Sequence, residues 1–332
     1  MMRSARIAVV IVAVASVVFP VAAAARVTGH LFVATLKRPY AILRFPLNDG
    51  IPSSTPDFKY PGRFNTITVG PDGSVYGDSW TNQQLVVFAP GIARPVRRIN
   101  FPVNIPGCSS PYSGPTQVEA LAVNRLGDLF VAYTTYFSGA RVAPRMLRVR
   151  RSVMYPCLGV VAYGPDAQGF AQPKAAMPMG GQYLNGLTMD LDGLLYVANS
   201  AYDLVQEYAD PGSHPRGFGF LTVGMTYPQA LATDPAENLY ELDGQFLTKN
   251  GVNVYAPGAG HGSAPTSTLL FESAYSWVED VAVWKTFLYA SDINYHGSWS
   301  VDVYNASANG TTAPIFSLPL TRPGAWFIAT GP

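Results

Sequence analysis

A short segment in which an aliphatic residue precedes an aromatic one recurs along the chain. The aromatic members of its six copies are Phe32, Tyr76, Phe130, Tyr196, Tyr240 and Tyr289. Consecutive copies lie 44 to 66 residues apart. That spacing is near the length of a four-stranded propeller blade and exceeds that of most solenoid repeats. The pattern therefore predicts six similar β-units around a common axis.

Further marks surround each copy in a constant order. A segment of small and apolar residues comes before the aromatic one in five copies, at residues 66–69, 120–123, 186–189, 230–233 and 280–283. Turns such as Asp72-Gly73 join the two segments, because tight hairpins need a positive φ that glycine supplies. A third segment ends in an aromatic residue and a Pro/Gly turn, and a proline then precedes a fourth. These prolines are Pro56, Pro95, Pro173, Pro215, Pro265 and Pro314. Edge strands tolerate proline, so the fourth strand is predicted to be the outer one.

The two ends of the chain complement each other. The first copy begins at His30 without a preceding inner strand, whereas residues 326–330 form an inner strand that no blade follows. Pairing these segments closes a ring and removes an exposed strand edge. We therefore predict an all-β, six-bladed β-propeller of four-stranded blades over residues 26–332, closed by pairing the C-terminal strand with the N-terminal blade.

These repeats resemble those of NHL-type propellers and, more loosely, the gluconolactonase-like superfamily. The resemblance rests on segments such as Leu195-Tyr196-Val197 and the run from Val252 to Gly258, and it covers residues 27–332. It implies the propeller fold and leaves the function open, because propellers serve as enzymes, receptors and scaffolds.

The N-terminus has the features of a secretory signal peptide. Arg3 and Arg6 precede an apolar run at residues 7–19, and small residues 22–25 offer a cleavage site. We expect residues 1–25 to be removed, leaving no membrane span; the alternative is a retained anchor at residues 7–25. Either reading predicts a protein outside the cytoplasm, secreted or periplasmic.

The low charge of the chain limits the kinds of partner that it can bind. The formal net charge is +1, only 13% of residues are charged, and no block of Lys or Arg occurs. Nucleic-acid binders carry a basic surface that neutralises phosphates, so this class is excluded. We expect a monomer whose partner is a small molecule, a glycan or a protein.

The residue just before each inner strand is polar in five of six blades. These positions are Asn65, Glu119, Asn185, Gln229, Glu279 and, in the last strand, Trp326. Equivalent positions of a propeller converge on one mouth of the central channel. Glu119, Asn185 and Glu279 are therefore candidate ligands for Ca²⁺ or Mg²⁺. The alternative is that these side chains cap strand ends or bind channel water.

The gluconolactonase-like resemblance carries over in part. Asn185-Gly186-Leu187 matches a ligand motif of that family, with Glu119 as a carboxylate ligand one blade earlier. The family's Pro-Asp-Gly motif is replaced by Pro228-Gln229-Ala230, and glutamine cannot accept a proton. Glu119 or Glu279 would then have to act as the base.

Aromatic residues occur in the predicted loops of the face that carries this mouth, which we call the loop-rich face. Trp80, Tyr202 and Trp299 in these loops are candidate ligand-binding residues, together with Asn65, Gln229 and Trp326 at the mouth. Flat rings bury area at low entropic cost, and adjacent amides offer hydrogen bonds. His296 is the sole histidine assigned to this face and is a third candidate acid or base. Packing between loops is the alternative for each aromatic residue, and a surface or packing role is the alternative for His296.

Cys108 and Cys157 are the two cysteines, and each falls in an insertion on the loop-rich face. In an exported protein this arrangement favours a disulfide between neighbouring loops. Two unpaired thiols are the alternative.

Two functional hypotheses follow. The first is an exported, non-catalytic binding or interaction module that uses the loop-rich face. The alternative is a metal-dependent, lactonase-like hydrolase or lyase at the channel mouth.

Overall fold

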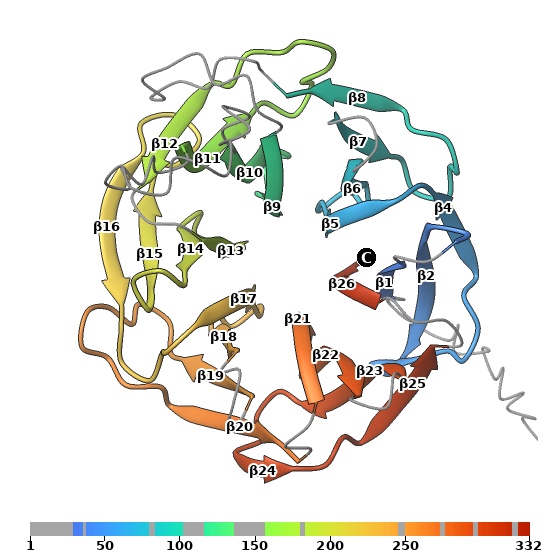
Figure 1. Cartoon of the computed structure of the whole chain (residues 1–332), viewed down its shortest axis with the longest axis vertical. Helices are drawn as coiled ribbons and strands as arrows, with labels where there is room; N and C mark the ends of the chain where they lie inside the picture. Colours follow the sequence, from blue (N-terminus) through green and yellow to red (C-terminus); the bar gives the residue numbers. More distant parts are fainter. Residues whose placement is uncertain are drawn as a thin grey trace, which may run out of the picture.

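The structure is a ring of six small β-sheets around a central axis (Figure 1). It is a computed structural model that describes residues 29–35, 38–79, 84–101, 116–135, 157–179, 183–244, 250–272, 276–294, 298–320 and 325–332. The protein is thus an all-β, six-bladed β-propeller, as the repeats predicted. Across the described ranges, no helix is long and apolar enough to cross a membrane.

Each blade contains four strands, which follow one another from the axis outward. The inner strands are β26 (Ala325–Gly331), β5 (Phe64–Val69), β9 (Thr116–Val123), β13 (Leu184–Met189), β17 (Pro228–Thr233) and β21 (Ser276–Trp284). The second strands, which carry the repeated aromatic residue, are β1 (His30–Thr35), β6 (Val75–Ser79), β10 (Leu129–Thr135), β14 (Leu195–Asn199), β18 (Leu239–Asp243) and β22 (Phe287–Asn294). We number the blades 1 to 6 in this order, so that blade 1 contains β26 and β1.

The outer half of each blade is built from two further strands. The third strands are β2 (Ala41–Asn48), β7 (Gln84–Phe88), β11 (Cys157–Tyr163), β15 (Leu204–Ala209), β19 (Gly251–Tyr255) and β23 (Trp299–Asn305). The outer strands are β4 (Phe58–Pro61), β8 (Arg97–Asn100), β12 (Ala175–Met179), β16 (Arg216–Leu221), β20 (Ser267–Phe271) and β25 (Phe316–Leu320). Each of the six repeat prolines stands one or two residues before an outer strand, which confirms the predicted role.

The ring is closed by strands from the two ends of the chain. β26 pairs antiparallel with β1, and the register places Ile328 opposite Val33 and Thr330 opposite Leu31. Blade 1 therefore combines one C-terminal strand with three N-terminal strands, as predicted. The inner edge of β1 is covered by this pairing.

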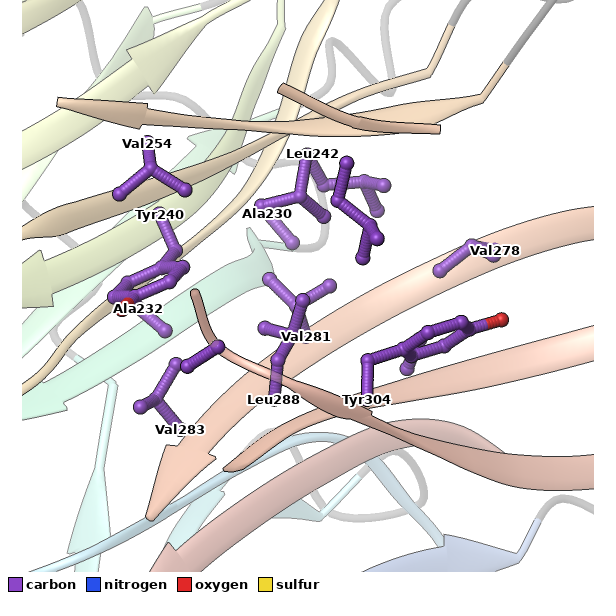
Figure 2. Close-up of a cluster of buried hydrophobic side chains, with 14 of the residues drawn as sticks. Ala230, Ala232, Tyr240, Leu242, Val254, Val278, Val281, Val283, Leu288 and Tyr304 are labelled. Carbon is purple, nitrogen blue, oxygen red and sulfur yellow. The ribbon is translucent and has the colours of Figure 1, made fainter. Parts of the chain in front are cut away.

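The hydrophobic core is divided into six clusters, one between each pair of neighbouring blades. Figure 2 shows the cluster between blades 5 and 6, where Tyr240 and Val254 of one blade approach Val281, Leu288 and Tyr304 of the other. Full burial of such a side chain stabilises the fold by about 1.5–3 kcal/mol. The apolar side chains therefore fill the spaces between neighbouring blades.

Two backbone contacts also join neighbouring blades at the outer wall. The short strand β24 (Gly310–Thr312) of blade 6 pairs in parallel with β20 of blade 5. At the equivalent place in blade 3, Gly169 bridges Ile99 in β8 of blade 2. A further short strand, β3 (Ile51–Pro52), pairs antiparallel with the end of β2. The fold therefore adds extended segments to outer strand edges.

Candidate functional site

The six inner strands surround a central channel. A cavity of about 370 Å³ follows the axis, and residues of all six inner strands line it. Its lining reaches from Glu119, Asn185 and Glu279 near the loop-rich face to turn residues Arg125 and Leu191 on the opposite face. Figure 1 shows the inner strands arranged around this axis. The channel mouth is therefore the place where equivalent residues of the blades converge.

Every inner strand contains a register shift at the predicted polar position. The ladder skips one or two residues, which are residues 65–66 in β5, Glu119 in β9, Asn185 in β13, Gln229 in β17, residues 279–280 in β21 and Trp326 in β26. Such β-bulges leave the extra residue outside the ladder and turn its side chain away from the regular alternation. The six positions are thus structurally equivalent, although sequence analysis missed the bulge itself.

Two of the bulge side chains hydrogen-bond residues in, or directly after, the second strand of their own blade. The amide of Asn65 donates to the carboxylate of Asp78 over 3.0 Å. The amide of Asn185 donates to the hydroxyl of Ser200 over 2.9 Å. Both asparagines are half-buried. These bonds fix the position of each amide nitrogen. The side-chain carbonyl oxygen of each asparagine can still accept a hydrogen bond from another partner.

A third contact joins two blades at the mouth. The amide of Gln229 in blade 5 donates to the carboxylate of Glu279 in blade 6 over 3.1 Å. In blade 3, the carboxylate of Glu119 accepts from the amide of Gln117 at 3.1 Å. The described hydrogen bond to each glutamate therefore comes from a neutral amide.

Burial changes the acidity of this region. It raises the pKa of Glu119 to about 7, although the nearby Thr134 hydroxyl and the amide of Gln117 act in the opposite direction. It also raises the pKa of Asp78 to about 7, against the hydrogen bond from Asn65. Carboxyls that titrate near neutral pH can both take up and release a proton.

The two glutamates face each other across the channel. Glu119 belongs to blade 3 and Glu279 to blade 6, so two blades lie between them in either direction around the ring. A cation that touched both would have to lie on the axis. In the described part of the chain, no group of three or more His, Cys, Asp or Glu side chains is placed to hold a metal ion. The proposed Glu119, Asn185 and Glu279 ligand set stays a prediction.

Asp280 is an acidic residue at the mouth that was not singled out from the sequence. It shares the bulge of β21 with Glu279, and its carboxylate accepts from the backbone N–H groups of Ile328 and Val281, each at 2.9 Å. Burial raises its pKa to about 7. The sequence contained a signal for this residue. The other inner segments open with a small or apolar residue, whereas this one opens with an acidic residue.

Packing explains the glycine in Asn185-Gly186-Leu187. A β-carbon at Gly186 would lie 2.9 Å from the carbonyl oxygen of Gln229 and 3.0 Å from the α-carbon of Ala230. Both are backbone atoms of β17, which cannot move aside as a flexible side chain would. The glycine therefore allows blades 4 and 5 to approach at the axis, and this requirement holds whether or not Asn185 binds a ligand.

Two exposed tyrosines lie on the blade 4 part of the loop-rich face. Tyr202 is 58% exposed in the turn after β14, and Tyr183, which sequence analysis missed, is 52% exposed just before β13. Backbone bonds hold both segments, because Ser200 donates to the carbonyl of Tyr183 and Tyr202 to that of Asn199. The rings therefore come from the two segments that carry the Asn185–Ser200 pair.

The remaining candidates divide into two groups. Trp299 opens β23 and is half-buried, and Trp326 lies at the bulge of β26. Trp80, His296 and Cys108 fall outside the described residues, as do residues 1–28 with the predicted signal peptide. Cys157 is the first residue of β11 and is not a free thiol. The Cys108–Cys157 disulfide stays a prediction.

Comparison with known proteins supports the fold. No protein-family model matches the chain, and no curated protein matches it. Among solved structures, a chain of a nidogen/laminin complex is similar, with a TM-score of 0.60, 13% identity, and coverage of 92% of this chain and 98% of that one. A protein of unknown function from Bacteroides caccae matches with a TM-score of 0.58, 10% identity, and coverage of 91% and 98%.

A third solved structure matches part of the chain. Hydrazine synthase from Kuenenia stuttgartiensis has a TM-score of 0.50 and 13% identity, covering 74% of this chain and 63% of that one. At such low identities the similarities show the propeller architecture and nothing finer. The resemblance to NHL-type and gluconolactonase-like propellers is not confirmed by a family match.

Proposed function

We propose that the protein is an exported interaction module that binds its partner on the loop-rich face, around the channel mouth and over blade 4. The ring of bulges supports this most directly, because it brings the polar residues of five blades to one mouth. Exposed Tyr183 and Tyr202 beside Asn185 add flat rings next to an amide. Such a pairing of rings and amides suits a glycan, a small polar molecule or a polar protein loop.

The nidogen/laminin neighbour is in keeping with this proposal. That propeller-like chain was crystallised in a complex with a protein partner, and it covers almost the whole of the present fold. A propeller of this size can therefore serve as a protein-binding platform. The identity of the partner does not transfer at 13% identity.

A direct test uses variants of the loop-rich face with a matched control. The probes are a panel of neutral oligosaccharides and a set of extracellular-matrix protein domains, with binding measured by calorimetry. We expect Tyr202→Ala and Gln229→Ala to weaken binding at least about tenfold, as anchoring interface residues do. Phe170→Ala, at a 78% exposed ring in the turn between β11 and β12, should leave it unchanged. Equal loss with Phe170→Ala, or no effect of the first two, contradicts the proposal.

The metal-dependent hydrolase or lyase is the second proposal, and the raised pKa of Glu119 favours it. A carboxyl that titrates near pH 7 suits a general base, and Glu119 with Asn185 and Glu279 would bind Ca²⁺ or Mg²⁺. The test is metal analysis of the purified protein with and without Glu279→Gln. No stoichiometric metal and no change in Tm on adding Ca²⁺ would rule this activity out.

Export is proposed from the N-terminal segment. Cleavage after residue 25 would release a protein with no apolar anchor, and an oxidising compartment would allow Cys108 and Cys157 to pair. Mass spectrometry of the protein recovered outside the cytoplasm tests this, because the intact mass reports both the cleavage and the disulfide. An intact residue 1–25 segment in that fraction would favour the retained anchor.

A further inference from the structure

The outer wall of blade 4 carries exposed aromatic side chains on a strand edge. β16 has the sequence Arg-Gly-Phe-Gly-Phe-Leu, in which Phe218 is 69% exposed and Phe220 is 41% exposed. The ring of Phe220 packs edge-on against His261 of blade 5, with 4.7 Å between centroids. Phe220 is thus held in place while one side of its ring faces solvent.

The other five outer strands have protected edges. Three contain a proline, which cannot donate to an added strand: Pro61 in β4, Pro178 in β12 and Pro319 in β25. The remaining two are covered by the next blade, since Gly169 bridges β8 and β24 pairs with β20. Natural sheets use such devices to prevent unwanted pairing.

In the described part of the chain, β16 has neither a proline nor a covering segment. A β-bulge at Phe218 interrupts its ladder with β15, and Gly219, Phe220 and Leu221 form its regular part. No proline or lysine occurs from Gly217 to Leu221, and no backbone group from another blade in the described ranges hydrogen-bonds this strand. Arg216, its single charged residue, pairs with Asp210 of the preceding turn at 3.4 Å. The edge is therefore open, aromatic and uncharged along most of its length.

The fold itself shows what such an edge accepts. β24 adds Gly310, Thr311 and Thr312 in parallel to Leu269, Leu270 and Phe271 of β20. The added segment is short, extended and uncharged. β20 and β16 occupy equivalent positions in neighbouring blades. β20 pairs regularly with β19, and the three residues of β16 after its bulge, Gly219 to Leu221, pair regularly with β15, so a three-residue addition is geometrically possible there.

We propose that β16 is a second binding surface, which takes up an extended, uncharged segment of a partner protein as an additional strand. Main-chain hydrogen bonds provide the pairing, and alternate apolar side chains of the partner pack against Phe218 and Phe220. This surface lies on the outer wall, apart from the channel mouth, and does not depend on the function proposed above.

A second copy of this chain is a poorer occupant. A six-residue strand is about 20 Å long, and pairing two such strands buries far less than the roughly 1,200 Å² of a stable interface. An extended peptide faces no such requirement, because it can continue along the wall beyond the strand. The proposal therefore commits to a partner segment rather than to self-association.

The test uses a defined probe. The probe is a segment of about six residues that alternates threonine and valine, the usual length of a strand, fused to a soluble carrier. Its control replaces alternate residues with proline, which removes the donors. We expect the first probe to bind and to slow hydrogen exchange of the amides of residues 216–221, and the proline probe to do neither. Binding without protection of these amides would overturn the proposal.

Variants separate this surface from general stickiness. Replacing both Phe218 and Phe220 with lysine should weaken binding at least tenfold, because edge lysines oppose pairing. Phe218→Glu alone provides a milder variant if the double variant fails to fold. Phe170→Lys is the matched control, since that ring is 78% exposed but lies outside the outer strands.

Two outcomes contradict the proposal. Equal binding by the wild type and by Phe218→Glu would place the probe elsewhere. Self-association of the wild type in sedimentation experiments, lost in the Phe218 variants, would identify a second copy as the occupant and replace the partner segment.

Discussion

The carboxylate of Asp280 accepts a hydrogen bond from the backbone N–H of Ile328 at 2.9 Å, although 48 positions separate the two residues in the chain. Asp280 lies in the inner strand of blade 6, whereas Ile328 lies in the strand that completes blade 1. A second bond follows the same boundary, from the hydroxyl of Thr330 to the carbonyl of Val283 at 2.7 Å. The closing strand is therefore held laterally by blade 6 as well as by its ladder with β1.

This relationship predicts the effect of Asp280→Ala. The substitution leaves the N–H of Ile328 without its acceptor, and an unsatisfied buried donor costs about 1–3 kcal/mol. We expect the free energy of unfolding to fall by that amount in urea denaturation. Glu272→Ala, at an exposed position at the end of β20, should change it by less than about 0.5 kcal/mol. A neutral Asp280→Ala would show that the ladder alone holds the closure.

Removing the closing strand should have a larger effect. A chain that ends at Arg322 lacks β26, so β1 would expose its inner edge and the clusters of blades 1, 2 and 6 would lose Ile328 and Ala329. We expect an insoluble protein, or one that unfolds without cooperativity, as measured by solubility and thermal melting. A soluble truncation that melts cooperatively would refute the ring closure.

Gly186→Ala tests the close approach of β13 and β17. The new methyl group would meet backbone atoms of Gln229 and Ala230 within about 3.0 Å, and overpacking of this kind costs about 1–3 kcal/mol. Gly164→Ala is the control, because nothing lies within 4 Å of its position. We expect a lower Tm for Gly186→Ala alone. Equal Tm values would mean that the two strands can separate at no cost.

The sequence was sufficient to predict the strand order and the ring closure because the repeat carries them within each blade. Proline before each outer strand and the unmatched strands at the two ends are local signals. The bulges at Glu119 and Asn185 were not predicted, since a skipped residue depends on how two strands pair. Nor was the Gln229–Glu279 bond, because it joins residues of different blades. Side chains that bond across blades cannot be read from a repeat alone.

Buried acids were also missed, although a signal was present. Glu241 occupies the position that Val197 holds in the repeat of blade 4, and it is fully buried between blades 4 and 5. Its one described partner is the amide of Asn253, at 2.9 Å from one carboxylate oxygen. A charged residue at a repeat position occupied elsewhere by valine indicates either a functional group or a protonated acid, and the sequence does not distinguish these.

The predicted Cys108–Cys157 disulfide should affect binding more than stability. Cys157 opens β11 opposite Thr135, at the loop end of blade 3 and at the margin of the cluster between blades 2 and 3. A bridge there would act mainly on the predicted loop that carries Cys108. We expect Tm to be nearly equal with and without a reductant, while binding on the loop-rich face weakens on reduction. Replacing both cysteines with serine should reproduce the reduced protein. Unfolding on reduction would contradict this placement.

Stability should increase as the pH falls from about 8 to about 5. Burial raises the pKa of Glu207 and of Asp280 to about 7, and that of Glu241 to about 8. In the unfolded chain these carboxyls titrate near their ordinary values, so between about pH 5 and pH 8 the folded protein binds more protons. Stability then decreases as the pH rises, by at most about 1.4 kcal/mol per pH unit for each such proton.

Glu241→Gln isolates one contribution to this pH dependence. Glutamine keeps an oxygen for Asn253 and carries no charge, so the free energy of unfolding should exceed that of the wild type at pH 8 and approach it at pH 5. Chemical denaturation across that range measures both, with Glu272→Gln as an exposed control that should retain the wild-type slope. A wild-type stability that rises with pH would mean that these acids are ionised in the folded protein. Their buried carboxylates would then require partners beyond Asn253 and the other described donors.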